Sequence, residues 1–299
     1  MANEVLSRGT LFPQVLATEV INKVQGKSSL AKLSGQMPIA FNGNEIFTFS
    51  LDNEIDVVAE NGKKTHGGIS IGTMKVQPIK VEYGARVSDE FMYASEEARI
   101  DILRPFTEGY AKKLARGLDL MAIHGVNPRT GTASEVIGEN YLDKKATQTA
   151  ALNAANPDET IETAVALVQG AGNVVSGMAL SPIFSALLAK YAVNGVKQFP
   201  EFRWGANPEA VNGLAVDVNE TISALKSQDR AIVGDFAGNF KWGLAKQIPM
   251  EVIQYGDPDN SGKDLRGYNQ VYIRCETYLG WAIMDGNAFA RITDSTATA

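Results

Sequence analysis

The chain has 299 residues, of which 44% are apolar and 21% charged, so it can bury a large core and is not intrinsically disordered. Its net charge of −6 argues against a protein whose main role is to wrap nucleic acid. The single cysteine, Cys275, excludes an internal disulfide framework, and the two histidines, His66 and His124, leave little for histidine-based metal or catalytic chemistry.

The sequence shows no signal for secretion or membrane insertion. Its N-terminus lacks a basic segment, and Glu19 and Lys23 interrupt the apolar residues that follow. Residues 163–189 carry no charged side chain and could span a bilayer, but several glycines and Pro182 divide them into two shorter elements. We therefore expect a soluble intracellular protein without a membrane partner.

Residues 1–40 are typical of an extended arm that contains a short helix. Leu16, Val20 and Val24 share one helical face, and the segment 26–29 is expected to end that helix. So short an apolar stripe cannot form a core alone. The arm is therefore expected to need another surface to cover it.

A long hairpin is predicted next. Phe47, Phe49 and Leu51 alternate with polar residues, as in a half-buried strand. The polar, glycine-rich segment 59–68 follows as a mobile tip, and a second extended stretch covers 69–87. Its apolar parity changes near Pro78, which predicts a bulge or an edge strand. An isolated hairpin is marginally stable, so this one is expected to lie against something else.

A helix is predicted to begin with Pro105 in its first turn and to end at Gly125. Its apolar residues recur at spacings of three and four; they are Phe106, Tyr110, Leu114, Leu118 and Met121. The other face is expected to be solvated or to face a neighbouring subunit. That face carries Glu108, Lys112, Lys113, Arg116 and Asp119.

The remaining elements are shorter, apart from the last. Asp158 is expected to cap a helix that ends near Gln169, and strand-like residues follow at 174–175 and 178–180. Residues 181–182 open a further helix to about Val193, which 194–195 ends. A final long strand is predicted over 271–284. The fold class is α+β, and terminal segments that flank a mixed middle part suggest a discontinuous domain.

Three short motifs suggest chemistry but lack the context that it needs. Residues 68–72 match the G-x-S-x-G pattern around Ser70, yet the following sequence is extended rather than helical. The segment 26–28 lacks the first glycine of a phosphate-binding loop. The segment 257–268 is similar to a calcium loop but has Tyr268 where a bidentate glutamate belongs, so a turn explains it better. We predict no catalytic, cofactor-binding or metal-binding residue.

Both histidines and the cysteine are given structural roles. His124 is expected to cap or pack against the end of the long helix, and His66 lies in the hairpin tip. Cys275 shares strand parity with apolar residues and should be buried. What remains is an arm, a projecting hairpin and apolar elements that need partners. These features suit a self-assembling shell subunit, and they equally suit a domain-swapped oligomer.

The order of the elements adds a family resemblance. In sequence the chain resembles the major capsid proteins of tailed bacteriophages, which have the Hong Kong 97 phage fold. The resemblance covers nearly all of residues 30–292, and none of its markers is a catalytic signature. The segments that carry it are 56–64, 74–81, 86–90, 120–125, 234–236, 242–243, 267–276, 281–285 and 288–289.

The resemblance implies a domain plan. It comprises an N-terminal arm at 1–42, an extended hairpin (the E-loop) at 43–87, a peripheral domain, an axial domain at 151–266 and a flexible tail at 293–299. The peripheral domain would be built on the long helix and would combine 88–150 with 267–292. Relatives often carry a scaffolding segment before the arm. This chain begins almost at the arm, so we expect cleavage, a separate scaffold or none.

The resemblance also implies a function: pentamers and hexamers of one chain that close into an icosahedral shell around double-stranded DNA. The hairpin tip would lie over an adjacent subunit, where Lys63 and Lys64 could pair with acidic groups; no crosslink is predicted. The interface candidates are Glu60, Lys63, Lys64, His66, Lys112 and Arg116.

Expected partners are further copies, scaffolding, portal and decoration proteins, and DNA bound without sequence specificity. The location would be the virion, after assembly in the bacterial cytoplasm. An encapsulin-like compartment that loads cargo enzymes is the alternative, and a serine hydrolase that uses Ser70 is a less favoured one.

Overall fold

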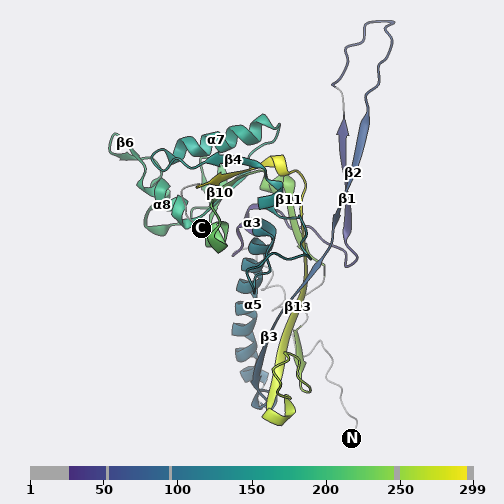
Figure 1. The fold of residues 1–299 in the computed structure, drawn as a ribbon, viewed down its shortest axis with the longest axis vertical. Helices are drawn as coiled ribbons and strands as arrows, with labels where there is room; N and C mark the ends of the chain where they lie inside the picture. Colours follow the sequence, from purple (N-terminus) through teal and green to yellow (C-terminus); the bar gives the residue numbers. More distant parts are fainter. Residues whose placement is uncertain (1–26, 52–53, 94–95, 246–249, 295–299) are drawn as a thin grey trace.

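The computed structural model describes residues 27–51, 54–93, 96–245 and 250–294. The molecule is elongated (Figure 1). Its helices are α3 (Ser29–Leu33), α4 (Glu90–Tyr93), α5 (Glu96–His124), α6 (Leu142–Lys145), α7 (Pro157–Gly170), α8 (Pro182–Lys190) and α9 (Phe236–Asn239). Four short 3-10 helices are η1 (Pro200–Gly205), η2 (Glu220–Lys226), η3 (Arg266–Tyr268) and η4 (Gly286–Ala288).

The strands form several sheets. A six-stranded sheet has the order β4-β14-β10-β5-β9-β8, a four-stranded sheet combines β11, β12 and β3 around β13, and two hairpins are β1–β2 and β6–β7. The bounds are β1 (Asn44–Leu51), β2 (Ile69–Val76), β3 (Ile79–Ser88), β4 (Gln148–Ala151), β5 (Gly177–Leu180), β6 (Ala192–Val193), β7 (Val196–Lys197), β8 (Ala210–Val211), β9 (Leu214–Val218), β10 (Asp229–Gly234), β11 (Phe240–Leu244), β12 (Met250–Ile253), β13 (Gln270–Ile283) and β14 (Phe289–Thr293).

The body has two main cores. One lies between α3, α5 and the C-terminal half of β13, where Leu118, Trp242 and Trp281 are buried. The other lies between the six-stranded sheet and helices α7 and α8, which cover it in Figure 1; Phe184 and Val233 belong to it. Among the described residues, no helix is long and apolar enough to cross a membrane.

The long helix α5 begins earlier than expected. We placed Pro105 in its first turn, whereas the helix starts at Glu96 and holds Pro105 in its interior. A proline removes one backbone hydrogen bond, and a long helix packed along its length can tolerate that loss. The predicted end is confirmed, because Gly125 follows His124 with a φ of +68°, the left-handed conformation that favours glycine after a helix.

The extended stretch 69–87 is two strands in two different sheets. β2 pairs with β1 in the projecting hairpin, whereas β3 pairs with β13 from Ser88–Gln270 to Ile79–Leu279. The parity change near Pro78 marks the break between β2 and β3 rather than a bulge. A proline between two strands cannot donate to either ladder, so the chain changes sheet there.

The final strand is confirmed to within a residue, since β13 ends at Ile283. The chain then returns to the six-stranded sheet as β14, which pairs with β10 and, in parallel, with β4. Our domain plan put both β4 and β14 largely in the peripheral domain. Thr293, expected in a flexible tail, lies in β14, and the Asp294 amide donates to the Gln228 carbonyl.

One helix start and one helix end differ from the predictions. α7 begins after Asn156, with Pro157 at its first position, so Asp158 lies in the first turn instead of capping it. Ser181 does cap α8, accepting a hydrogen bond from the Phe184 amide. However, α8 ends at Lys190, and the segment 194–195 forms the turn of the small β6–β7 hairpin.

Two further expectations concern the strand at 174–175 and the helix of the N-terminal arm. Residues 174–175 are not in a strand, because β5 begins at Gly177. The helix expected around Leu16, Val20 and Val24 lies outside the described residues. Ser28, expected to help end that helix, instead caps α3, because its hydroxyl accepts a hydrogen bond from the Ala31 amide.

Candidate assembly surfaces and a buried ionic cluster

The projecting hairpin exposes one apolar face. The register pairs Phe47 with Thr73, so these residues and the alternate positions Ile69 and Ile71 lie on the same side of the ribbon. Phe47 is 57% exposed, Ile69 65% and Ile71 63%. The other face packs near its base, where Ile46 and Met74 contact a small core that includes Val76. The outer apolar face has no such cover within the described chain.

The base of this hairpin is fixed by close contacts. The Asn44 side chain accepts a hydrogen bond from the Ala40 amide and donates one to the Pro38 carbonyl, both at 2.8 Å. Gly43 has a φ of +88°, and a Cβ there would lie 2.8 Å from the Val76 carbonyl oxygen. The hairpin therefore leaves the body at a defined position.

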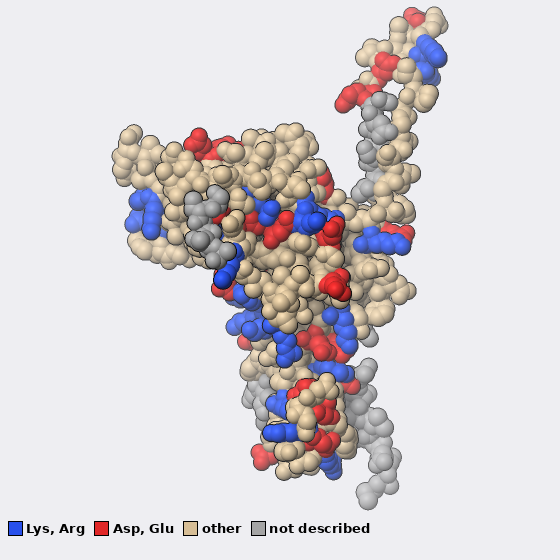
Figure 2. Space-filling view, in the orientation of Figure 1, with Lys and Arg blue, Asp and Glu red and all other residues tan. Residues whose placement is uncertain are grey.

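Four of the predicted interface residues lie together at the tip of the hairpin. Glu60, Lys63, Lys64 and His66 are all exposed there. The Thr65 hydroxyl donates to the Asp56 carboxylate at 2.7 Å across the tip. Figure 2 shows charged side chains of both signs at this end of the molecule. A tip of this kind can pair with either sign of charge on another surface.

The other two predicted residues lie on α5, away from the hairpin tip (Figure 1). Lys112 is exposed, as expected. Arg116 forms an ion pair with Glu220, a contact within the chain that sequence reasoning missed. Within one chain the structure thus does not bring α5 and the tip together.

A groove runs between α5, β3 and the loop 127–137. Its volume is 690 Å³. Apolar side chains of β3 and α5 line it, among them Ile79, Val81 and Met121. Lys113, Arg116 and Arg129 also line it. Lys80 and the carboxylate of Glu82 line it as well, so the groove combines apolar surface with a net positive charge.

The described geometry supports neither the catalytic motif around Ser70 nor the calcium-loop motif that begins at Asp257. Ser70 lies within β2, opposite Ser50, and not at a turn between a strand and a helix. In the 257–264 turn, the Asp257 carboxylate accepts hydrogen bonds from the amides of Ser261 and Gly262. Arg86 pairs with Asp257 and Asp259, so backbone amides and a guanidinium already engage these oxygens.

A buried carboxylate was missed by the sequence analysis. We placed Asp119 on the polar face of the long helix, but it is fully buried and accepts hydrogen bonds from the Ser28 hydroxyl at 2.5 Å and the Ser29 amide at 3.1 Å. The Leu30 amide and the Thr221 hydroxyl also donate to it. Burial raises the pKa of Asp119 to about 6, although these donors oppose the rise. Asp119 thus ties α3 and η2 to α5.

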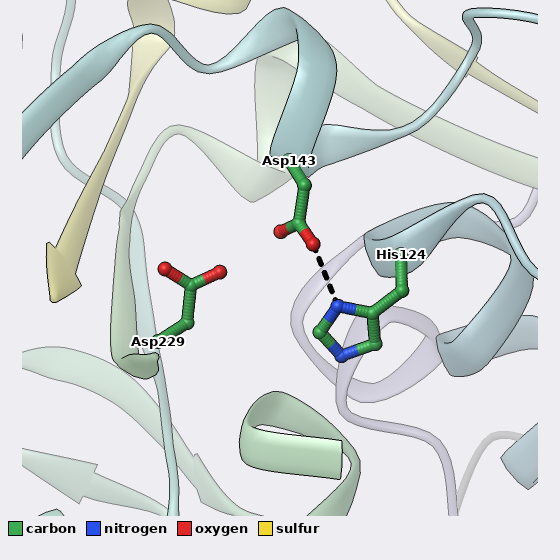
Figure 3. A group of neighbouring side chains, drawn as sticks. All are labelled: His124, Asp143 and Asp229. Carbon is green, nitrogen blue, oxygen red and sulfur yellow. Dashed lines mark hydrogen bonds and ion pairs between the residues drawn. The ribbon is translucent and has the colours of Figure 1, made fainter. Parts of the chain in front are cut away.

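His124 lies in an ionic cluster, although no carboxylate stands at metal-ligand spacing from it in the sequence. Its Nδ1 is 2.7 Å from an Asp143 oxygen of α6, and its Nε2 is 2.8 Å from the Thr221 carbonyl oxygen (Figure 3). Asp229 of β10 lies beside them, with its carboxylate 3.2 Å from Arg291 of β14. The Arg291 guanidinium is also 3.6 Å from Asp143.

The cluster is an ion-pair network. The ligand atoms of His124, Asp143 and Asp229 lie within 4.8 Å of one another, a spacing that a metal ion could bridge. Arg291 already supplies positive charge to both carboxylates, which disfavours a cation there.

Two groups in the network have shifted pKa values. Burial alone would lower the pKa of His124, but the hydrogen bond and charge of Asp143 outweigh it, so the pKa is raised. Burial raises the pKa of Asp229 to about 6; Asp143 adds to the rise and Arg291 opposes it.

The lone cysteine behaves as predicted. Cys275 is buried in β13, and its burial raises the pKa of the thiol to about 12. A thiol of this kind is a poor nucleophile.

Comparison with known proteins gives the family. The phage capsid family matches residues 8–294, nearly the whole chain. The chain belongs to this family, whose role is structural. The predicted Hong Kong 97-type α+β fold is thereby confirmed, and so is the prediction of a major capsid structural protein.

Solved structures agree. A protein of Mycobacterium phage Ogopogo is 30% identical with a TM-score of 0.76, over 90% of this chain and 92% of that one. One of Gordonia phage Cozz is 24% identical with a TM-score of 0.74, over 90% and 87%. The capsid of an empty GTA particle shares the fold at 13% identity and a TM-score of 0.64, over 90% of each chain. No curated protein matches the chain.

Proposed function

We propose that this chain forms the pentamers and hexamers of a closed icosahedral shell that holds double-stranded DNA without reading its sequence. The observation that carries the proposal is the uncovered apolar face of the β1–β2 hairpin, with Phe47, Ile69 and Ile71 exposed. Burial of these side chains on another copy would favour assembly by about 25 cal/mol for each Å² removed from water. Repetition over many copies makes such small contacts sufficient.

The groove beside α5 is the proposed acceptor for the hairpin of a neighbouring copy. Its apolar walls match the hairpin face, and its cations Lys113 and Arg129 match the tip carboxylates, among them Glu60. Because α5 and the tip are apart within one chain, the interface candidates Lys112 and Arg116 would meet the tip only between copies. This arrangement supports a heterologous contact, which forms a ring when the rotation between successive copies closes.

We propose domains that follow the strand pairing. The hairpin would comprise 43–78 and the arm 1–42. The axial domain would be built on the six-stranded sheet and would include 148–151 and 289–293 in addition to the middle segment, because β4 and β14 pair there. The peripheral domain would keep α5 with β3 and β13. Scaffolding, portal and decoration proteins are proposed partners, and assembly is proposed to take place in the cytoplasm of a bacterial host.

Electron microscopy of the protein expressed alone tests the proposal. After size-exclusion chromatography, negative stain should show closed shells or rings of five or six subunits. Ile71→Ser and a deletion of residues 59–68 should give folded subunits that fail to assemble. Ser70→Ala is the matched control, because it changes the adjacent position of the same strand and should leave shells intact.

Three results would contradict these expectations. Normal shells from both hairpin variants would exclude the proposed role of the hairpin. Shells filled with a cargo protein, and not DNA, in the native host would indicate an encapsulin-like compartment. Hydrolysis of a simple ester that disappears in Ser70→Ala would support the enzyme alternative instead.

A further inference from the structure

The buried ionic cluster lies where the end of the long helix meets the six-stranded sheet. His124 is the last residue of α5, Asp143 lies in α6, Asp229 in β10 and Arg291 in β14. Arg291 Nε also donates to the Ala146 carbonyl at 3.0 Å, just after α6. These contacts join α5 and α6, together called the α5–α6 unit, to the sheet through side chains that are far apart in sequence.

The net charge of the cluster is zero only when it holds one proton more than a neutral imidazole and two ionised carboxylates would carry. With His124 protonated, two cations face two carboxylates, Asp143 and Asp229. Without that proton, Arg291 alone faces both carboxylates in a largely buried site, which costs free energy. The Asp143 oxygen that lies 3.6 Å from the Arg291 guanidinium is buried and accepts no hydrogen bond from the described residues, so nearby positive charge is needed to stabilise it.

We propose that His124, Asp143, Asp229 and Arg291 form a proton-dependent joint that holds the α5–α6 unit on the six-stranded sheet and loosens as pH rises. The inference is independent of the proposed shell, because it concerns contacts within one chain.

The direction follows from the two shifted groups. Both His124 and Asp229 have pKa values raised above the ordinary ones, that of Asp229 to about 6. A raised pKa means that the folded state binds the proton more tightly than the unfolded state, so the stability that it contributes is lost as pH rises through the folded value. For Asp229 the loss ends near pH 6, and for His124 it continues above its ordinary pKa of about 6.5.

Other charged groups surround the joint. On β10, Arg230 pairs with Asp294, and on α6, Lys145 donates to the Ile283 carbonyl. On α5, Asp119 accepts from Thr221 of η2, whose carbonyl faces His124. The pKa of Asp119 is also raised, so its titration acts in the same direction. Two further ion pairs lie on these elements, Lys144 with Glu139 and Arg116 with Glu220.

Amide hydrogen exchange of the full chain between about pH 5 and about pH 8 tests the joint. After correction for the intrinsic rates, the opening constant of residues 120–125 and 142–146 should rise with pH, by at most about tenfold per unit for each proton lost. Asp229→Asn, which imitates the protonated carboxyl, should reduce this slope. The matched control Asp158→Asn, in the first turn of α7, should keep the wild-type slope. Equal slopes in wild type and Asp229→Asn would overturn the proposal.

A second measurement tests the joint in the wild-type protein, with an exposed-site variant used only for assignment. The chain has only two histidines, so ring NMR signals from labelled histidine can be assigned with His66→Gln. The His124 ring should titrate above the ordinary value of about 6.5 in the wild type. Asp143→Asn should shift that titration downward. A wild-type His124 ring that titrates below about 6.5 would overturn the joint.

Discussion

In the body of the protein, the apolar side chains of α5 face a continuous core, whereas those of the β1–β2 hairpin lie open to solvent on one face. Ile123 of α5 is fully buried, while Ile71 of β2 is 63% exposed. An isoleucine in α5 is thus covered by the core, whereas the isoleucine in β2 is largely uncovered by the described part of the chain. The body is thus stabilised by the folding of a single copy, and the exposed hairpin face is where we propose contact between copies.

The sharpest test of this comparison uses one substitution in both regions. Ile123→Ala should lower the free energy of unfolding by about 2–5 kcal/mol, because it opens a cavity in the core. Ile71→Ala should change it by no more than about 0.5 kcal/mol, because the side chain is exposed. Urea unfolding of unassembled subunits measures both. A loss of several kcal/mol in Ile71→Ala would show that the hairpin face is covered within the chain.

A smaller effect is expected at the carboxylate that fastens α3 to the body. Asp119→Asn removes one acceptor oxygen and leaves donors of Ser28 or Thr221 unpaired, so we expect a loss of about 2–4 kcal/mol in the free energy of unfolding. Thermal and urea unfolding report the loss, with Asp158→Asn as the control. Wild-type stability in Asp119→Asn would mean that these hydrogen bonds do not hold the segment.

The smallest effect is expected at the exposed turn after β12. The hydrogen bond from Arg86 lowers the pKa of Asp259 well below its ordinary value. Arg86→Lys removes the paired geometry, so its melting temperature should be slightly below that of the wild type at neutral pH. A lowered carboxyl pKa gives stability that is lost as pH falls, so the difference should shrink below about pH 4. A difference that grows in acid would contradict this pairing.

Local patterns predicted the elements whose causes are local. Ser181 caps α8 through a residue three positions away, and Gly125 ends α5 through its own backbone conformation. The final strand was found because its alternation spans many residues. The start of α5 was missed, because Pro105 indicates a first turn unless packing along the rest of the helix outweighs its cost.

The groups of side chains that meet from distant parts of the chain could not be predicted from local patterns. Asp119 is paired with Ser28 and Thr221, which lie 91 and 102 positions away, and no local spacing reveals such partners. One signal was present, since Asp119 interrupts the apolar residues Leu118 and Leu120. The alternation predicted the hairpin strands, but it assigned Phe47 to a half-buried face, whereas Phe47 is exposed and the opposite face packs at the base. The groove that we propose as its acceptor was not predicted, because it combines β3, α5 and a loop.

The fixed base of the hairpin gives it the mechanics of a lever. Each of its strands has eight residues, or about 26 Å, measured from the anchor at Gly43 and Asn44. A rotation of about 10° at that anchor would move the far end of the strands by about 5 Å over this length. A small change of angle at this one point would therefore displace the far end of the hairpin by several ångströms, without a rearrangement of the body.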